Sequence, residues 1–121
     1  MHVSVIVTCY NEERNIRECL ETLINQTYDN DKFEILVIDG GSKDATQSIV
    51  KEFEKVYHNV TLAVEPKRGT AAGRNRGVVT ARYDYVAFID ADCEAPHDWL
   101  STLVKDYVKI QKKSEGVVAV G

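Results

Sequence analysis

Two aspartates one residue apart, Asp90 and Asp92, directly follow the apolar run of residues 86–89. Paired carboxylates at the end of a buried strand are hard oxygen ligands that can hold Mg²⁺ or Mn²⁺, while water and phosphate oxygens complete the coordination shell. The same Asp-x-Asp spacing occurs at residues 29–31, in a polar stretch where Asp and Asn favour side-chain to backbone turns. We therefore predict a metal site at Asp90 and Asp92 and a turn at residues 29–31. Helix capping and loop hydrogen bonding are the alternative for the first pair.

The segments after the first two apolar runs carry groups suited to a nucleotide. Tyr10 offers an aromatic face to a base, and Glu12 offers a carboxylate to ribose hydroxyls or base edges. Asn11 is also suited to cap a helix N-terminus, and the two uses of this segment are compatible. Asp39 is followed by two glycines, which permit a sharp turn and close approach of a ligand. Two roles are open for this aspartate: it forms a hydrogen bond to a base or a ribose, or it caps its own loop.

A basic segment, residues 67–77, leads into a predicted helix and contains Arg74. Backbone N–H groups at a helix N-terminus and arginine side chains both bind anions, so the segment suits a diphosphate. A solvated surface is the simpler interpretation of the charge cluster taken alone.

Five short runs rich in Val, Ile and Phe predict the strands that position these groups: residues 3–8, 34–39, 61–65, 85–90 and 117–120. Their near-continuous apolar character is typical of parallel strands buried on both faces. Helical spacing of apolar residues follows the first, second and fourth runs. Residues 71–82 predict a weaker helix, because Gly73 and Gly77 lower helix propensity. We expect Asp44 to cap the second helix and Pro96 to lie in the first turn of the fourth.

The alternation of strand and helix predicts an α/β fold with an open, mostly parallel, doubly wound sheet. Such sheets bind ligands at the carboxyl ends of their strands, where the winding direction reverses. With the strand order 3-2-1-4, Thr8 and Asp90 face one crevice, and Asp39 lies along the same edge.

Length and composition are those of one globular domain. The 121 residues suffice for a single core, and 44% hydrophobic and 28% charged residues are ordinary values. A net charge of −4 argues against a nucleic-acid partner, and no apolar run is long enough to span a membrane. Three cysteines without CxxC spacing disfavour a disulfide framework or a zinc site. We expect a cytoplasmic protein, or one held at the cytoplasmic face of a membrane through parts outside this chain.

Other classes with similar sheets lack their signatures here. The first strand leads into Cys9-Tyr10-Asn11-Glu12 rather than Gly-x-Gly-x-x-Gly, which disfavours a Rossmann dehydrogenase, and no P-loop motif occurs. A phosphoacceptor signalling module would need clustered acids on the first strand and a lysine ending the fifth, and neither is present.

Four motifs in order, residues 3–12, 37–46, 73–77 and 87–92, resemble the family 2 glycosyltransferases of the GT-A fold over essentially the whole chain. The resemblance implies a GT-A, Rossmann-like sheet. It also implies metal-assisted, inverting transfer of a sugar from a UDP- or GDP-sugar to an acceptor, which is a glycan, a lipid carrier or a protein. By the same resemblance, the residues that bind the nucleotide-sugar are Thr8, Tyr10, Glu12, Asp39, Arg74 and Asp90. Asp92, together with Asp90, is implied to bind the divalent metal, Mn²⁺ or Mg²⁺.

Two departures from the family pattern matter. Gly40 stands where many members have a second aspartate, so the choice between uridine and guanosine is left open. Family members also continue through strands that carry the acceptor pocket and a catalytic carboxylate. We therefore expect residues 1–121 to form one nucleotide-sugar-binding domain, truncated after about five strands and incomplete at its C-terminus, with the general base beyond Gly121. A donor-binding fragment or module without transferase activity of its own is the alternative.

Overall fold

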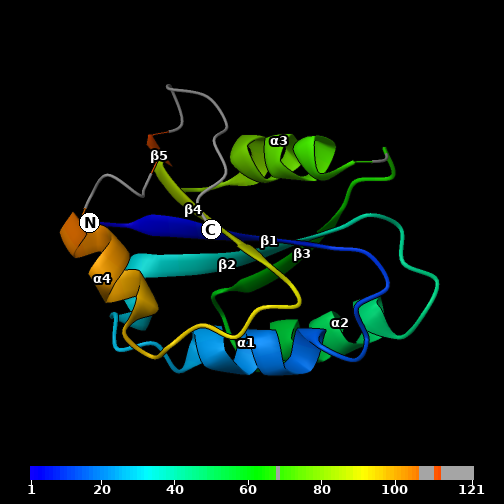
Figure 1. The fold of residues 1–121 in the computed structure, drawn as a ribbon, viewed down its shortest axis with the longest axis horizontal. Helices are drawn as coiled ribbons and strands as arrows, with labels where there is room; N and C mark the ends of the chain where they lie inside the picture. The colour runs from blue at the N-terminus through cyan, green and yellow to red at the C-terminus, as the bar shows by residue number, and fades with distance from the viewer. Residues whose placement is uncertain (68, 107–110, 113–121) are drawn as a thin grey trace.

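A central sheet with helices on both faces forms the molecule (Figure 1). The computed structural model describes residues 1–67, 69–106 and 111–112. Within these residues the strands lie in the order β3-β2-β1-β4-β5. They are β1 (Val3–Cys9), β2 (Phe33–Asp39), β3 (Val60–Val64), β4 (Tyr85–Asp90) and β5 (Gln111–Lys112).

The first four strands run parallel, and their arrangement confirms the predicted order 3-2-1-4 and the α/β fold class. The short β5 pairs with β4 in the antiparallel direction, at a place where no apolar run predicted a strand. The strand predicted at residues 117–120 lies outside the described residues.

The two faces of the sheet bury separate apolar clusters, because successive side chains of a strand point to opposite faces. On β1, Val3, Val5 and Val7 face a large cluster that includes residues of α1 (Ile16–Ile24), α2 (Thr46–Val56) and α4 (Trp99–Asp106). Ile6 faces a smaller cluster below α3 (Thr70–Thr80). α1 and α2 therefore cover one face and α3 the other, as Figure 1 shows.

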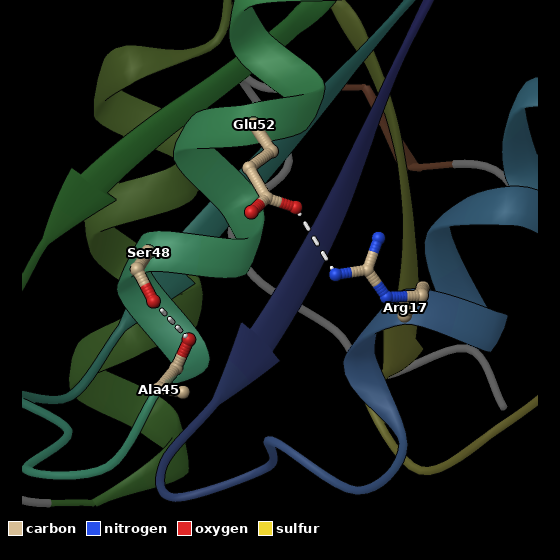
Figure 2. Close-up of polar contacts among 4 residues, drawn as sticks. All are labelled: Arg17, Ala45, Ser48 and Glu52. Atoms are coloured by element: carbon tan, nitrogen blue, oxygen red, sulfur yellow. Dashed lines mark hydrogen bonds and ion pairs between the residues drawn. The ribbon is translucent and has the colours of Figure 1, made fainter.

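α1 and α2 lie side by side, and a polar contact joins them on the outside. Arg17 of α1 forms an ion pair with Glu52 of α2 at 3.0 Å (Figure 2). Within the first turn of α2, the Ser48 hydroxyl donates to the Ala45 carbonyl at 2.9 Å. Both members of the ion pair are at least half exposed, so packing of the apolar faces contributes most of the stability here.

The two glycines that weaken the helical pattern of residues 71–82 are required by the packing of α3 on β1. A Cβ atom at Gly77 would lie 2.5 Å from Cγ2 of Ile6, and one at Gly73 would lie 3.1 Å from Cγ2 of Thr8. The two glycines therefore let α3 approach β1 more closely than side chains would permit. Their cost in helix propensity is offset by this close packing.

Three helix starts differ from their predictions. Asn11 does not cap α1; its φ is 51° and Asn15 holds the N-cap position, because Asn11 bonds across to another loop. Asp44 lies one residue before the N-cap of α2, although its carboxylate does accept the Thr46 N–H at 2.9 Å. Pro96 lies before α4, where its carbonyl accepts the Trp99 N–H.

The segment between β4 and α4 is hydrogen-bonded to α1 and to the residues directly after it. Gln26 donates to the Pro96 carbonyl at 2.7 Å and accepts the Leu100 N–H at 2.8 Å. The Thr22 hydroxyl accepts the Ala95 N–H at 3.0 Å. These bonds fix the course of the chain directly after Asp92. In the part of the chain that the structure describes, no helix combines the length and apolarity needed to cross a bilayer.

Candidate functional site

A hollow of about 450 Å³ lies at the carboxyl edge of the parallel strands. Such an edge is where doubly wound sheets bind their ligands. Segments that follow four different strands line the hollow, with these residues: Thr8, Cys9, Tyr10, Glu12, Ile38, Gly40, Glu65, Lys67, Gly69, Thr70, Gly73, Asp90, Ala91 and Asp92. Five of the seven residues predicted for the site are among them: Thr8, Tyr10, Glu12, Asp90 and Asp92.

As predicted, Thr8 and Asp90 lie together at the switch point, the place between β1 and β4 where the winding direction of the sheet reverses. They are register partners on β1 and β4, and the Thr8 hydroxyl donates to Asp90 Oδ1 at 3.5 Å. The chain then turns, with the Ala91 N–H bonded to the Thr8 carbonyl and the Cys93 N–H to the Asp90 carbonyl. The side chains of Asp90 and Asp92 are exposed at this turn and both line the hollow. Their carboxylates are thus open to a ligand.

Asp39 lies at the same edge but is not part of the lining. Its side chain is fully buried, and it accepts bonds from the Gly41 and Ser42 amides, the Ser42 hydroxyl, the Gln47 amide and the Cys9 thiol. Burial alone would raise the pKa of this carboxyl, but the hydrogen bonds led by those from Ser42 and Gln47 hold the pKa below its ordinary value. In this structure Asp39 stabilises the turn after β2, which is the loop-capping role that the sequence left open.

The loops after β1 and β2 are joined to each other by hydrogen bonds. The Asn11 amide N–H donates to the Ser42 hydroxyl at 2.7 Å, and the Asn11 side chain accepts the Lys43 N–H at 2.9 Å. The Glu12 N–H donates to the Thr46 hydroxyl at 2.8 Å. These bonds fix the backbone directly after Tyr10, and the Gly40 N–H fixes it directly before by donating to the Cys9 carbonyl at 2.9 Å. Tyr10 is 40% exposed at the hollow. A flat apolar ring is therefore held in place at the rim.

Arg74 lies apart from the lining. It extends from α3, and its guanidinium carbon lies 5.7 Å from the centre of the Phe88 ring. Cation–π stacking of this kind orients an arginine on an aromatic face. The first turn of α3 reaches the hollow instead through Gly69, Thr70 and Gly73.

Glu65, which is outside the seven predicted residues, also lines the hollow, and so does Lys67, the first residue of the basic segment predicted to suit a diphosphate. Glu65 directly follows β3, and its N–H donates to the Asp39 carbonyl at 2.8 Å. Its place at the end of the third predicted strand was a usable signal, because strand ends of a parallel sheet share one edge.

Among the described residues of the lining, the charged groups are four carboxylates, Glu12, Glu65, Asp90 and Asp92, and one ammonium, Lys67. An anionic ligand placed here requires additional positive charge. No cluster of three or more metal-ligating acids, histidines or cysteines occurs among residues 1–67, 69–106 and 111–112. The candidate donor set in the lining is the pair of carboxylates of Asp90 and Asp92. It fits a hard cation such as Mg²⁺ or Mn²⁺, which takes its remaining ligands from water and phosphate oxygens.

The cysteines near the hollow are not poised as nucleophiles. Burial raises the pKa of the Cys19 thiol to about 12, and burial with the neighbouring Asp39 raises that of Cys9 further still. Burial and Asp92 raise the pKa of the Cys93 thiol as well. Thiols with raised pKa values are poor nucleophiles at neutral pH.

An α/β sheet of this strand order, with a hollow at its switch point, defines a domain of the doubly wound class, which binds ligands at the carboxyl ends of its strands. The sequence profile described as "Glycosyl transferase family 2" matches residues 4–118. The chain therefore belongs to glycosyltransferase family 2.

Individual relatives agree with this assignment. The chain is 40% identical over 99 residues to "Glycosyltransferase AglE" of Haloferax volcanii, covering 81% of this chain and 33% of that protein. It is 38% identical over 109 residues to "Glycosyltransferase GlyA" of Streptococcus pneumoniae, covering 90% of this chain and 15% of that protein. The chain thus spans a third or less of the length of these curated relatives.

Solved structures share the fold over a similar part of this chain. The mannosyltransferase PcManGT from Pyrobaculum calidifontis, in complex with GDP-Man and Mn²⁺, superposes with a TM-score of 0.80 at 36% identity, covering 86% of this chain and 31% of that chain. S. aureus TarS 1–349 in complex with UDP-GlcNAc superposes with a TM-score of 0.78 at 30% identity, covering 87% and 30%. The predicted family and GT-A, Rossmann-like fold are thereby confirmed.

Proposed function

We propose that this chain binds the nucleotide-sugar donor of a metal-dependent glycosyltransferase. The observation that carries the proposal is the hollow at the switch point, where Thr8, Tyr10 and Asp92 come together from two strand ends. The similarity to solved proteins in complex with UDP-GlcNAc and with GDP-Man and Mn²⁺ supports it.

The charge of the hollow supports a metal. Two phosphates would meet four carboxylates and one ammonium, an arrangement that repels an anion without a counter-charge. Asp92 and Asp90 would hold a divalent cation, which would supply that charge and the electrostatic stabilisation of a leaving diphosphate.

The remaining roles follow from placement. Tyr10 presents its ring to the base, and Thr8 and Glu12 lie within the hollow where ribose hydroxyls can bond them. Asp39 was predicted to contact the nucleotide-sugar directly, but its carboxylate accepts hydrogen bonds from Ser42. We therefore expect Asp39 to contribute to binding by stabilising the turn after β2. Arg74 as a phosphate contact stays a prediction, and it requires the guanidinium to leave the Phe88 ring.

The proposed reaction is an inverting displacement. An acceptor hydroxyl loses its proton to a general base and attacks the anomeric carbon from the face opposite the nucleoside diphosphate, whose bond to the sugar breaks. We place that base beyond Gly121, and the acceptor, whether glycan, lipid carrier or protein, on parts outside this chain. The alternative, that the chain acts only as a donor-binding module, has the same hollow and differs only in transfer.

The free thiols of Cys9, Cys19 and Cys93 are in keeping with a cytoplasmic location, which we include in the proposal.

Calorimetric titration with UDP and GDP, in Mn²⁺ and in EDTA, tests the proposal. We expect binding of at least one nucleotide in Mn²⁺, weakened by about tenfold or more in EDTA, which corresponds to about 1.4 kcal/mol. Absence of binding to both nucleotides in Mn²⁺ contradicts it.

A further inference from the structure

Glu65 and the pair Asp90 and Asp92 lie at opposite ends of the hollow. Glu65 follows β3, the aspartates end and follow β4, and β2 and β1 lie between these two strands. With neighbouring strands about 4.8 Å apart, the two ends are separated by roughly 14 Å. A nucleoside diphosphate whose phosphates lie at Asp92 therefore extends its base toward Glu65.

Glu65 is held as a fixed acceptor. Its N–H donates to the Asp39 carbonyl at 2.8 Å, and its Oε2 accepts the Lys67 N–H at 3.2 Å. The side chain is half-buried, and it forms no ion pair with any residue that the structure describes. A carboxylate has two oxygens and about four acceptor sites, so most of its capacity is left for a ligand.

Among the described acids of the lining, Glu12 follows β1, Asp90 and Asp92 belong to the end of β4, and Glu65 alone follows β3. Asp39 is fully buried and its oxygens accept bonds from its own turn. Gly40 has no side chain, and a Cβ there would already lie 3.4 Å from Cδ1 of the Tyr10 ring. Glu65 is therefore the carboxylate that can accept hydrogen bonds from the edge of a base at the β3 end of the hollow. Lys67 also lines this end.

We propose that Glu65 selects a guanine nucleotide; this inference rests on the proposed donor-binding function. The edge of guanine presents an acceptor, O6, next to two donors, N1–H and N2–H₂. A carboxylate accepts both donors at once, and the Lys67 ammonium is a matching donor for O6. Uracil presents one N–H between two carbonyl oxygens. One oxygen of Glu65 would accept the uracil N–H, and the other would face the uracil O2. Both of these facing atoms are acceptors, so they would repel each other.

Titration calorimetry in Mn²⁺ with GDP, IDP and UDP tests the proposal on the unmodified protein. IDP lacks only the 2-amino group, so it removes one of the two bonds to Glu65 and nothing else. We expect GDP to bind at least about tenfold more tightly than IDP, and UDP no more tightly than IDP. UDP or IDP binding as tightly as GDP overturns the guanine assignment while leaving the donor-binding function intact. Failure of all three to bind overturns both.

The variant Glu65→Gln separates base reading from a structural role. Its amide replaces one acceptor by a donor, so GDP affinity should fall to the level of IDP while UDP affinity stays the same or rises. Equal weakening of GDP and UDP contradicts the proposal, because it indicates that Glu65 only holds the turn at Lys67. Glu18→Gln, the same chemical change at an exposed site on α1, is the control and should alter neither affinity.

Discussion

Asp39 and Asp92 have the same residue type and lie at the carboxyl ends of strands, yet the structure gives them opposite environments. The first is fully buried and accepts bonds from its own loop, whereas the second is exposed at the hollow. Sequence could place both at one edge, because strand ends are readable from apolar runs. It could not tell which carboxylate stays open, since that depends on Ser42 and Gln47 turning back toward Asp39.

At the residue scale, Asp92→Asn should abolish the effect of metal on nucleotide binding. An amide oxygen is a weaker ligand than a carboxylate for a hard cation, and only Asp90 would remain. We expect affinity in Mn²⁺ to fall to the level in EDTA, a loss of about tenfold, with unchanged thermal unfolding. Asp31→Asn is a matched control, because it removes an acid from the same Asp-x-Asp spacing at a turn far from the hollow. An Mn²⁺ effect that persists in Asp92→Asn rules out this metal assignment.

Asp39→Asn should destabilise the fold in a pH-dependent way. The folded pKa of Asp39 lies below its ordinary value of 3.8, so its stabilisation is present above that value and is lost as pH falls through the folded pKa. We expect the free energy of unfolding at pH 7 to fall by about 2 kcal/mol, and the difference from wild type to shrink below about pH 4. Urea unfolding of both proteins at pH 7 and below about pH 4 measures this difference in free energy of unfolding, with the exposed Asp84→Asn as control. A difference that is the same at both pH values contradicts the account.

At the scale of elements, the sequence predicted the parallel strands better than the helix starts. Apolar runs such as Val3–Cys9 are set by burial on both faces, which leaves a continuous local pattern. Asn11 has the type of a helix cap but adopts a positive φ and bonds to Lys43, 32 residues away in sequence. Contacts between loops of different strands override the local capping preference, and no local pattern reports them. β5 was missed because two residues are too short to show a period.

Gly77→Ala tests whether α3 needs glycine to pack on β1. The added Cβ would lie 2.5 Å from Cγ2 and 3.0 Å from Cδ1 of Ile6, a fully buried side chain. Overpacking of this kind costs about 1–3 kcal/mol, which exceeds the gain in helix propensity of about 1 kcal/mol. We expect a lower midpoint in urea for Gly77→Ala and an unchanged or higher one for Asn75→Ala, an exposed position of the same helix. A stabilised Gly77→Ala would mean that the helix lies further from the sheet.

At the scale of the whole molecule, every side chain assigned to chemistry belongs to the donor side of the reaction. Loss of a general base alone costs about 10²–10⁴-fold in rate, and loss of acceptor positioning costs more. We therefore expect residues 1–121 to bind donor without transferring its sugar. Incubation with UDP- and GDP-sugars, Mn²⁺ and candidate acceptors, followed by mass spectrometry, measures this. Robust glycosylation of an acceptor would mean that an acid of this chain, such as Glu94 or Asp98, serves as the base.

The central claim, that the hollow at the switch point holds a nucleoside diphosphate, is tested most directly by mapping amide chemical shifts. The 13.6 kDa chain is small enough for complete ¹⁵N–¹H spectra, and Mg²⁺ keeps the sample diamagnetic. On addition of GDP or UDP with Mg²⁺, we predict the largest shifts at the amides of Tyr10, Gly40, Glu65 and Asp92, which come from all four parallel strand ends. The account is contradicted if these amides stay unchanged, or if the shifts gather instead at the opposite edge of the sheet, around Asn59 and Arg82.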